Sequence, residues 1–183
     1  MIISVRKFVL CVCCALLCLS SCVRTEQVDV LIVGGGASGI SAGIQCARMG
    51  VPAMIVEETP WVGGMLTAAG VSCIDGNYNL QSGIFGEFAD SLARRYGGWE
   101  ALQTGWVSYI NFEPQVGQEV LTNMAEGCEL LEVRRETMML DVARKEGKWV
   151  VLFKSAEGRK SKVAANILID GTELGDVAKA CGV

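Results

Sequence analysis

The stretch that decides the fold is Val28-Asp29-Val30-Leu31-Ile32-Val33-Gly34-Gly35-Gly36-Ala37-Ser38-Gly39. Its apolar first half predicts a buried parallel strand, and its glycine-rich second half predicts a tight turn that opens a helix. Gly34, Gly36 and Gly39 have the spacing G-x-G-x-x-G. In this pattern the first glycine permits the turn, the second lets the backbone approach a pyrophosphate, and the third lets the helix pack against the strand.

The segment that follows supports a dinucleotide site. A helix is expected from Ala37 to Met49, so the first amides of the helix, at Ala37, Ser38 and Gly39, would face the phosphates together with the positive end of the helix dipole. Glu57 closes the next apolar strand, 53–56, and lies 23 residues after Gly34. An acid at this distance accepts hydrogen bonds from a ribose diol, and its charge disfavours a 2′-phosphorylated cofactor.

The residues before this motif have the pattern of an export signal. Arg6 and Lys7 precede an apolar run, 8–19, that is too short to span a bilayer, and Leu19-Ser20-Ser21-Cys22 follows it. This ending resembles the lipobox of bacterial lipoproteins. It implies a signal peptide at 1–21, an acylated Cys22 that anchors the chain in a lipid bilayer, and a tether at 22–27. By resemblance to the sorting rules of double-membraned bacteria, Val23 in place of aspartate after the cysteine implies the outer membrane of the cell envelope and not retention at the inner membrane. An ordinary secretory leader that ends in a cysteine is the alternative.

Composition excludes several classes of function. Without the leader, 14 basic and 20 acidic residues remain, with no basic patch, so nucleic acid is not an expected partner. The chain has no histidine, and five of its nine cysteines lie in the leader or at its end. The other four form no C-x-x-C pair, so no metal site is predicted.

The rest of the chain reads as alternating helices and strands around one long loop. The loop is expected at 58–78, and its length suggests that it covers a ligand. Helices are predicted at 83–96 and 114–125, and strands at 129–133, 138–144, 149–154 and 162–169.

This order of parts resembles the FAD-dependent oxidoreductases that have a glutathione-reductase-like cofactor domain. The resemblance rests on the glycine motif with Glu57, on 57–67 with its double glycine, and on 166–176, which resembles the strand returning to the parallel sheet. It implies an α/β fold: a Rossmann-like FAD-binding domain at 28–183 with an inserted small antiparallel β-sheet. Members of the family continue beyond this point into a substrate domain, so we expect a C-terminally truncated domain that alone binds FAD weakly and turns over nothing.

The resemblance also implies the cofactor contacts. They are Gly34, Gly36, Ala37, Ser38, Gly39, Glu57, Glu58, Gly63, Gly64 and Met65, with secondary contacts from Thr67, Thr172 and Asp176. The three secondary contacts have a structural alternative, in which the threonines cap turns and the aspartate starts a helix.

For the complete protein the resemblance implies hydride transfer between a small organic substrate and the flavin, and it identifies no catalytic residue. Two alternatives stay open at this point: an NAD-binding dehydrogenase, and a non-catalytic, lipid-anchored remnant that keeps the dinucleotide fold.

Overall fold

The computed structural model describes residues 25–75 and 79–183, in which a six-stranded sheet has the order β5-β2-β1-β8-β7-β6. The predicted signal peptide and the acylation site Cys22 lie outside these residues. The strands are β1 (Thr25–Val33), β2 (Ala53–Val56), β5 (Leu131–Arg134), β6 (Thr137–Lys145), β7 (Lys148–Ser155) and β8 (Lys160–Asp170).

Four of these strands, β5, β2, β1 and β8, are parallel. The first strand, β1, begins at Thr25, three residues before the expected start of the domain at Val28. Thr25 is paired with Lys162 and Gln27 with Ala164 on β8. The last three residues of the expected tether therefore belong to the sheet.

The other two strands, β6 and β7, form a hairpin, and β7 pairs antiparallel with the first half of β8. The strand expected at 129–133 is present as β5 and does not belong to this antiparallel part. As β5 it pairs parallel to β2, because Leu131 and Val133 pack against the helix-side core.

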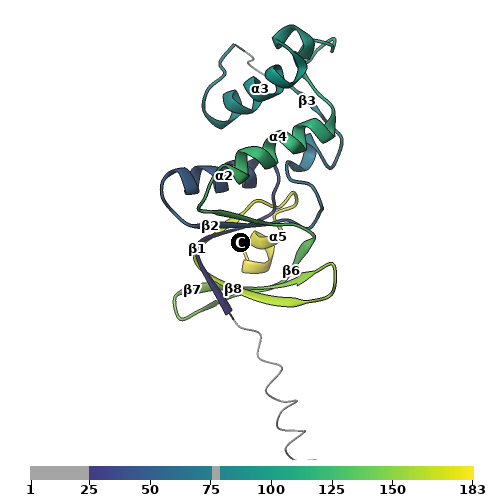
Figure 1. Ribbon diagram of the computed structural model, residues 1–183. Coiled ribbons are helices and arrows are strands. Elements are labelled where there is room, and N and C mark those ends of the chain that lie inside the picture. The colour runs from purple at the N-terminus through teal and green to yellow at the C-terminus, as the bar shows by residue number, and fades with distance from the viewer. Residues whose placement is uncertain (1–24, 76–78) are drawn as a thin grey trace, which may run out of the picture.

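Successive side chains of β1 point to opposite faces of the sheet, so this strand contributes to two separate cores. Val30 and Ile32 pack in a core formed with α2 (Ala37–Arg48), α3 (Gly83–Tyr96) and α4 (Pro114–Glu126). In Figure 1 these helices lie on one side of β1 and β2, with α4 between α2 and α3.

The opposite face of β1 is covered by the antiparallel strands. Leu31 and Val33 pack with Val151 and Phe153 of β7, and with Val177 of α5 (Asp176–Cys181). Figure 1 shows α5 on the side of the sheet away from α2 and α4. The predicted fold class, a Rossmann-like α/β domain with added antiparallel strands, is confirmed.

The long loop predicted at 58–78 contains short elements that the sequence did not indicate. They are a 3-10 turn, η1 (Gly64–Leu66), and β3 (Cys73–Ile74), which pairs antiparallel with β4 (Ile110–Asn111). A second 3-10 turn, η2 (Trp99–Leu102), follows α3. Within 25–75 and 79–183, none of the helices has the length and apolar character needed to cross a membrane.

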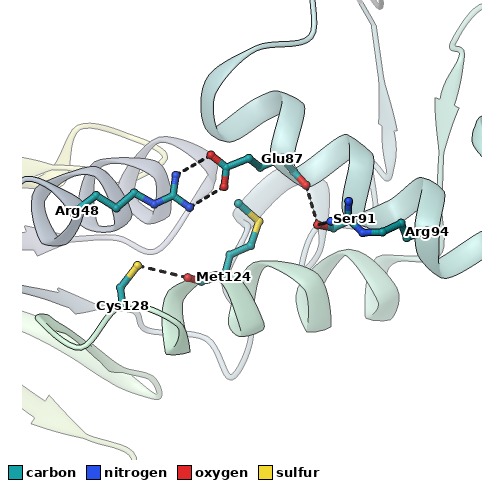
Figure 2. A network of polar contacts seen from close by, with 6 residues as sticks. All are labelled: Arg48, Glu87, Ser91, Arg94, Met124 and Cys128. Atoms are coloured by element: carbon teal, nitrogen blue, oxygen red, sulfur yellow. Dashed lines mark hydrogen bonds and ion pairs between the residues drawn. The ribbon is translucent and has the colours of Figure 1, made fainter.

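Polar contacts also connect the helices that pack against β1 and β2. Arg48 at the end of α2 makes a two-pronged ion pair with Glu87 of α3, with N–O distances of 2.7 and 2.6 Å (Figure 2). The hydrogen bond with Glu87 raises the pKa of Arg48, and the same bond lowers the pKa of Glu87. Nearby, the Cys128 thiol donates to the Met124 carbonyl at the end of α4.

Candidate functional site

The predicted site lies where β1, β2 and β8 end, at the carboxyl edge of the parallel strands. The amide of Gly34 donates to the Val56 carbonyl at 2.8 Å, and the amide of Gly171 donates to the Val33 carbonyl at 2.8 Å. These bonds bring the turns after β1 and β8 together. The carboxyl edge of such a sheet is where α/β proteins bind their ligands.

Two glycines of the motif are required by packing. Gly34 has φ of +97°, and a Cβ there would overlap the Gly171 carbonyl. A Cβ on Gly39 would overlap the Gly34 carbonyl. These positions let the turn, the helix and the returning strand approach each other closely.

Gly36 lines the cavity, as Gly34 does, but a Cβ on Gly36 would meet no backbone atom closer than 3.7 Å. It has an extended backbone, with φ of −61° and ψ of −177°, and it stands at the start of α2. No side chain caps this end of α2, and its first turn contains no acidic residue. Ala37 and Ser38 are exposed there. The first amides and the positive dipole end of α2 are therefore available to an anion.

Glu57 is buried, with 7% of its surface exposed, and backbone amides hold its carboxylate. Its Oε2 accepts from the Gly35 amide at 2.6 Å, and its Oε1 accepts from the Thr59 amide at 2.8 Å. A carboxylate has about four lone-pair sites, so about two remain for a ligand. The next residue, Glu58, is exposed and lines the cavity.

The double glycine packs against the glycine turn. The Gly63 amide donates to the Gly35 carbonyl at 2.8 Å, and Gly63 forms a bridge with Gly36. Gly64 and Met65 reach the cavity wall, whereas Gly63 lies behind it.

Thr67 does not line the cavity. It is 1% exposed, and its hydroxyl donates to the Val62 carbonyl at 2.6 Å. This geometry fits the structural alternative, in which Thr67 closes the turn that carries the double glycine, and its cofactor contact stays a prediction.

The turn after β8 is held by Asp170, which the sequence analysis did not single out. Its Oδ1 accepts from the amide of Thr172 at 3.0 Å and from its hydroxyl at 2.6 Å, and its Oδ2 accepts from the Ala178 amide at 2.9 Å. Thr172 Oγ1 in turn accepts from the Asp176 amide at 2.8 Å. Burial alone raises the pKa of Asp170, but the bonds from Thr172 and from the backbone outweigh it and lower that pKa.

These elements enclose a cavity of about 650 Å³, within the usual range for small-molecule sites. Of the predicted contacts it is lined by Gly34, Gly36, Glu57, Glu58, Gly64, Met65, Thr172 and Asp176. Ala37, Ser38, Gly39, Gly63 and Thr67 are not part of the lining. Further lining residues were not predicted from the sequence, among them Thr59, Ala68, Ala69, Thr137, Met138, Met139, Glu173 and Leu174.

Most of the missed residues carried no motif of their own. Met138 and Met139 come from β6, whose start lies beside the segment after β2, because the Thr137 amide donates to the Glu57 carbonyl at 3.0 Å. Glu173 could have been found from its place beside Thr172, since both follow the returning strand.

Comparison with known proteins decides the family. The model of the family described as FAD dependent oxidoreductase matches residues 29–183. The chain belongs to this family. Its cofactor is FAD, as the sequence predicted, and the NAD-binding alternative is not favoured.

Relatives agree with this assignment over parts of their length. The chain is 36% identical over 73 residues to a mitochondrial dihydrolipoyl dehydrogenase of Dictyostelium discoideum, a match that spans 40% of this chain and 14% of that protein.

Solved structures share the fold at low identity. A flavoprotein/dehydrogenase of Cytophaga hutchinsonii has a TM-score of 0.65 at 17% identity, over 86% of this chain and 42% of its own. A p-nitrophenol 4-monooxygenase of Pseudomonas putida has a TM-score of 0.58 at 15% identity, over 86% of this chain and 44% of its own. The chain thus spans less than half the length of these proteins.

Proposed function

We propose that the cavity holds the ADP half of FAD, with the diphosphate beside the Gly34–Gly36 turn. One observation supports this proposal most directly: the glycine turn, the uncapped start of α2 and the Glu57 carboxylate all meet at one cavity. Gly36 presents no side chain to the diphosphate. The amides of Ala37, Ser38 and Gly39 and the α2 dipole supply its electrostatic stabilisation.

Glu57 would accept the hydroxyl protons of the adenosine ribose. The amides of Gly35 and Thr59 fix its carboxylate, so its remaining lone pairs are oriented before the ligand arrives. This preorganisation lowers the entropic cost of binding. A 2′-phosphate would bring a second anion against the same carboxylate, so the site favours FAD over a 2′-phosphorylated cofactor.

The remaining contacts surround this core. Glu58, Gly64 and Met65 would line the adenosine and diphosphate part, while Gly63 supports the double glycine from behind. Thr172 and Asp176, at the end of β8, would contact the cofactor where it leaves the ADP subsite toward the flavin.

When bound, FAD supplies the redox chemistry, by accepting or donating a hydride equivalent. The residues described here bind and orient the cofactor. We propose that the complete protein is an enzyme that oxidises or reduces a small organic molecule, with catalytic groups that the contacts of this domain do not identify.

We also propose that the protein is a lipoprotein of the cell envelope, anchored through acylated Cys22 at the outer membrane of a double-membraned bacterium. The support is the order of charged, apolar and small residues before that cysteine.

The proposal is tested by retention of flavin. The purified chain is dialysed to equilibrium against FAD, and in a parallel sample against NAD, with lysozyme as a protein that should retain neither. Bound FAD is measured by its visible absorbance and bound NAD by its ultraviolet absorbance. We expect saturable retention of the flavin spectrum and no comparable retention of NAD. Equal retention of both, or of neither, would contradict the assignment of the cavity to FAD.

A further inference from the structure

We propose that Glu173 is an internal occupant of the phosphate subsite, and that its carboxylate must leave before a diphosphate binds. The inference rests on the proposed function, because it concerns the same cavity. It adds a residue that sets the affinity of the site, through competition between an anion of the chain and an anion of the ligand.

The geometry places the Glu173 carboxylate in a slot between two glycines. A Cβ on Gly36 would lie 3.2 Å from Glu173 Oε1, and a Cβ on Gly64 would overlap the same oxygen. Gly64 and Gly36 also approach each other closely, since a Cβ on Gly64 would lie 3.0 Å from the Gly36 Cα. The slot is therefore narrow, it is open because both positions lack a side chain, and it contains one carboxylate oxygen.

The same slot is where the proposed function requires a phosphate oxygen. It adjoins the start of α2, where the helix dipole attracts negative charge and no side chain caps the amides. A glutamate carboxylate and a phosphate are both anions with oxygen acceptors, so one can occupy the position of the other.

The surrounding charges make joint occupancy unfavourable. Three other carboxylates line the cavity, those of Glu57, Glu58 and Asp176, and among the described residues no lysine or arginine lines it. A diphosphate beside Glu173 would meet repulsion with no cation to reduce it.

The turn that carries Glu173 allows the side chain to leave. Glu173 is exposed, and Leu174 beside it is 86% exposed. Rotation of the Glu173 side chain would move its carboxylate into solvent without disturbing Asp170, which holds the turn through Thr172 and Ala178.

The test compares ADP with adenosine on the full chain by titration calorimetry, for wild type, Glu173→Gln and Glu173→Ala. ADP contains the diphosphate and adenosine does not. Glu129→Gln, which neutralises an exposed carboxylate outside the cavity, is the matched control. Because Gln keeps the shape and removes the charge, we expect Glu173→Gln to bind ADP about tenfold more tightly, the effect of removing one close like charge.

Glu173→Ala should bind ADP at least as tightly as Glu173→Gln, while adenosine affinity should be the same in all four proteins. Unchanged or weaker ADP binding by Glu173→Gln would overturn the inference. That result would leave the proposed function standing if wild type binds ADP, whereas failure of every variant to bind ADP would remove both.

Discussion

The glycines of the turn after β1 have different neighbours, so at the scale of single residues substitutions there should differ in effect. Gly39→Ala places a Cβ against the Gly34 carbonyl, which is backbone and cannot move aside. We expect a loss of about 1–3 kcal/mol in the free energy of unfolding, measured by urea denaturation. Gly127→Ala is the control, because its Cβ would lie 3.4 Å from its nearest neighbour. Equal stability of Gly39→Ala and wild type would contradict the packing described here.

Asp170 should make the turn after β8 sensitive to acid. Its pKa is lowered in the folded state, so its contribution to stability is present above the ordinary carboxyl pKa and is lost as pH falls through the folded pKa. The group is exposed, so we expect Asp170→Asn to lower the free energy of unfolding by only about 1 kcal/mol at pH 7. Urea titrations of both proteins at pH 7 and in acid should show this difference shrinking as Asp170 is protonated. A difference that grew in acid would contradict this assignment.

At the residue scale, the sequence predicted features that depend on one property of a residue type, such as the absence of a side chain in glycine. The spacing of Gly34, Gly36 and Gly39 predicted a turn opening a helix, and the structure has it. The sequence did not predict contacts that depend on the direction in which a side chain points. Thr67 faces the Val62 carbonyl, and Glu173 enters a slot formed by residues far away in the sequence. Neither direction follows from local pattern.

At the scale of elements, the pair Arg48–Glu87 joins α2 to α3 but should add little stability. Its atoms are close to solvent, with side-chain exposures of 37% and 49%, and exposed ion pairs contribute about 0–1 kcal/mol. We expect Glu87→Gln to lower the free energy of unfolding by about 0.5 kcal/mol in low salt, and by less in 1 M NaCl, because salt screens the pair.

The matched control for this pair is Asp90→Asn, which removes an exposed charge from the same helix. Thermal or urea unfolding of the three proteins at both salt concentrations checks the prediction. A loss of several kcal/mol for Glu87→Gln, or one that salt does not reduce, would mean that α3 depends on this contact far more than its exposure implies.

Most elements were predictable because their periodicity is strong. The helix at Gly83–Tyr96 was predicted at both ends, and Pro114 correctly marked the start of α4. The pairing of the strands was harder to predict from the sequence, because it depends on contacts between segments that are distant in the chain. The strand β5 joins β2 and not the hairpin, and β1 extends back to Thr25 because β8 is long enough to pair with it.

At the scale of the whole molecule, two layers cover opposite faces of β1 and β2 (Figure 1), and the cavity lies at the carboxyl edge of the parallel strands. The turns after β1 and β8, the segment after β2 and the start of β6 converge there on one cavity. The central claim is that a diphosphate binds in this cavity beside Gly36.

The most direct test is ADP titration of the wild-type chain and of Gly36→Val by calorimetry. Valine is compatible with the extended backbone at this position, and its Cβ would press mainly on the flexible end of Glu173. The fold should therefore survive, as checked by the thermal midpoint without ligand, with Gly127→Val as a control outside the cavity.

We expect wild type and Gly127→Val to bind one ADP per chain, and Gly36→Val to bind at least about tenfold more weakly, because its side chain fills the space of a phosphate oxygen. Equal ADP affinity in Gly36→Val and wild type, or no binding by the wild-type chain, would contradict the account.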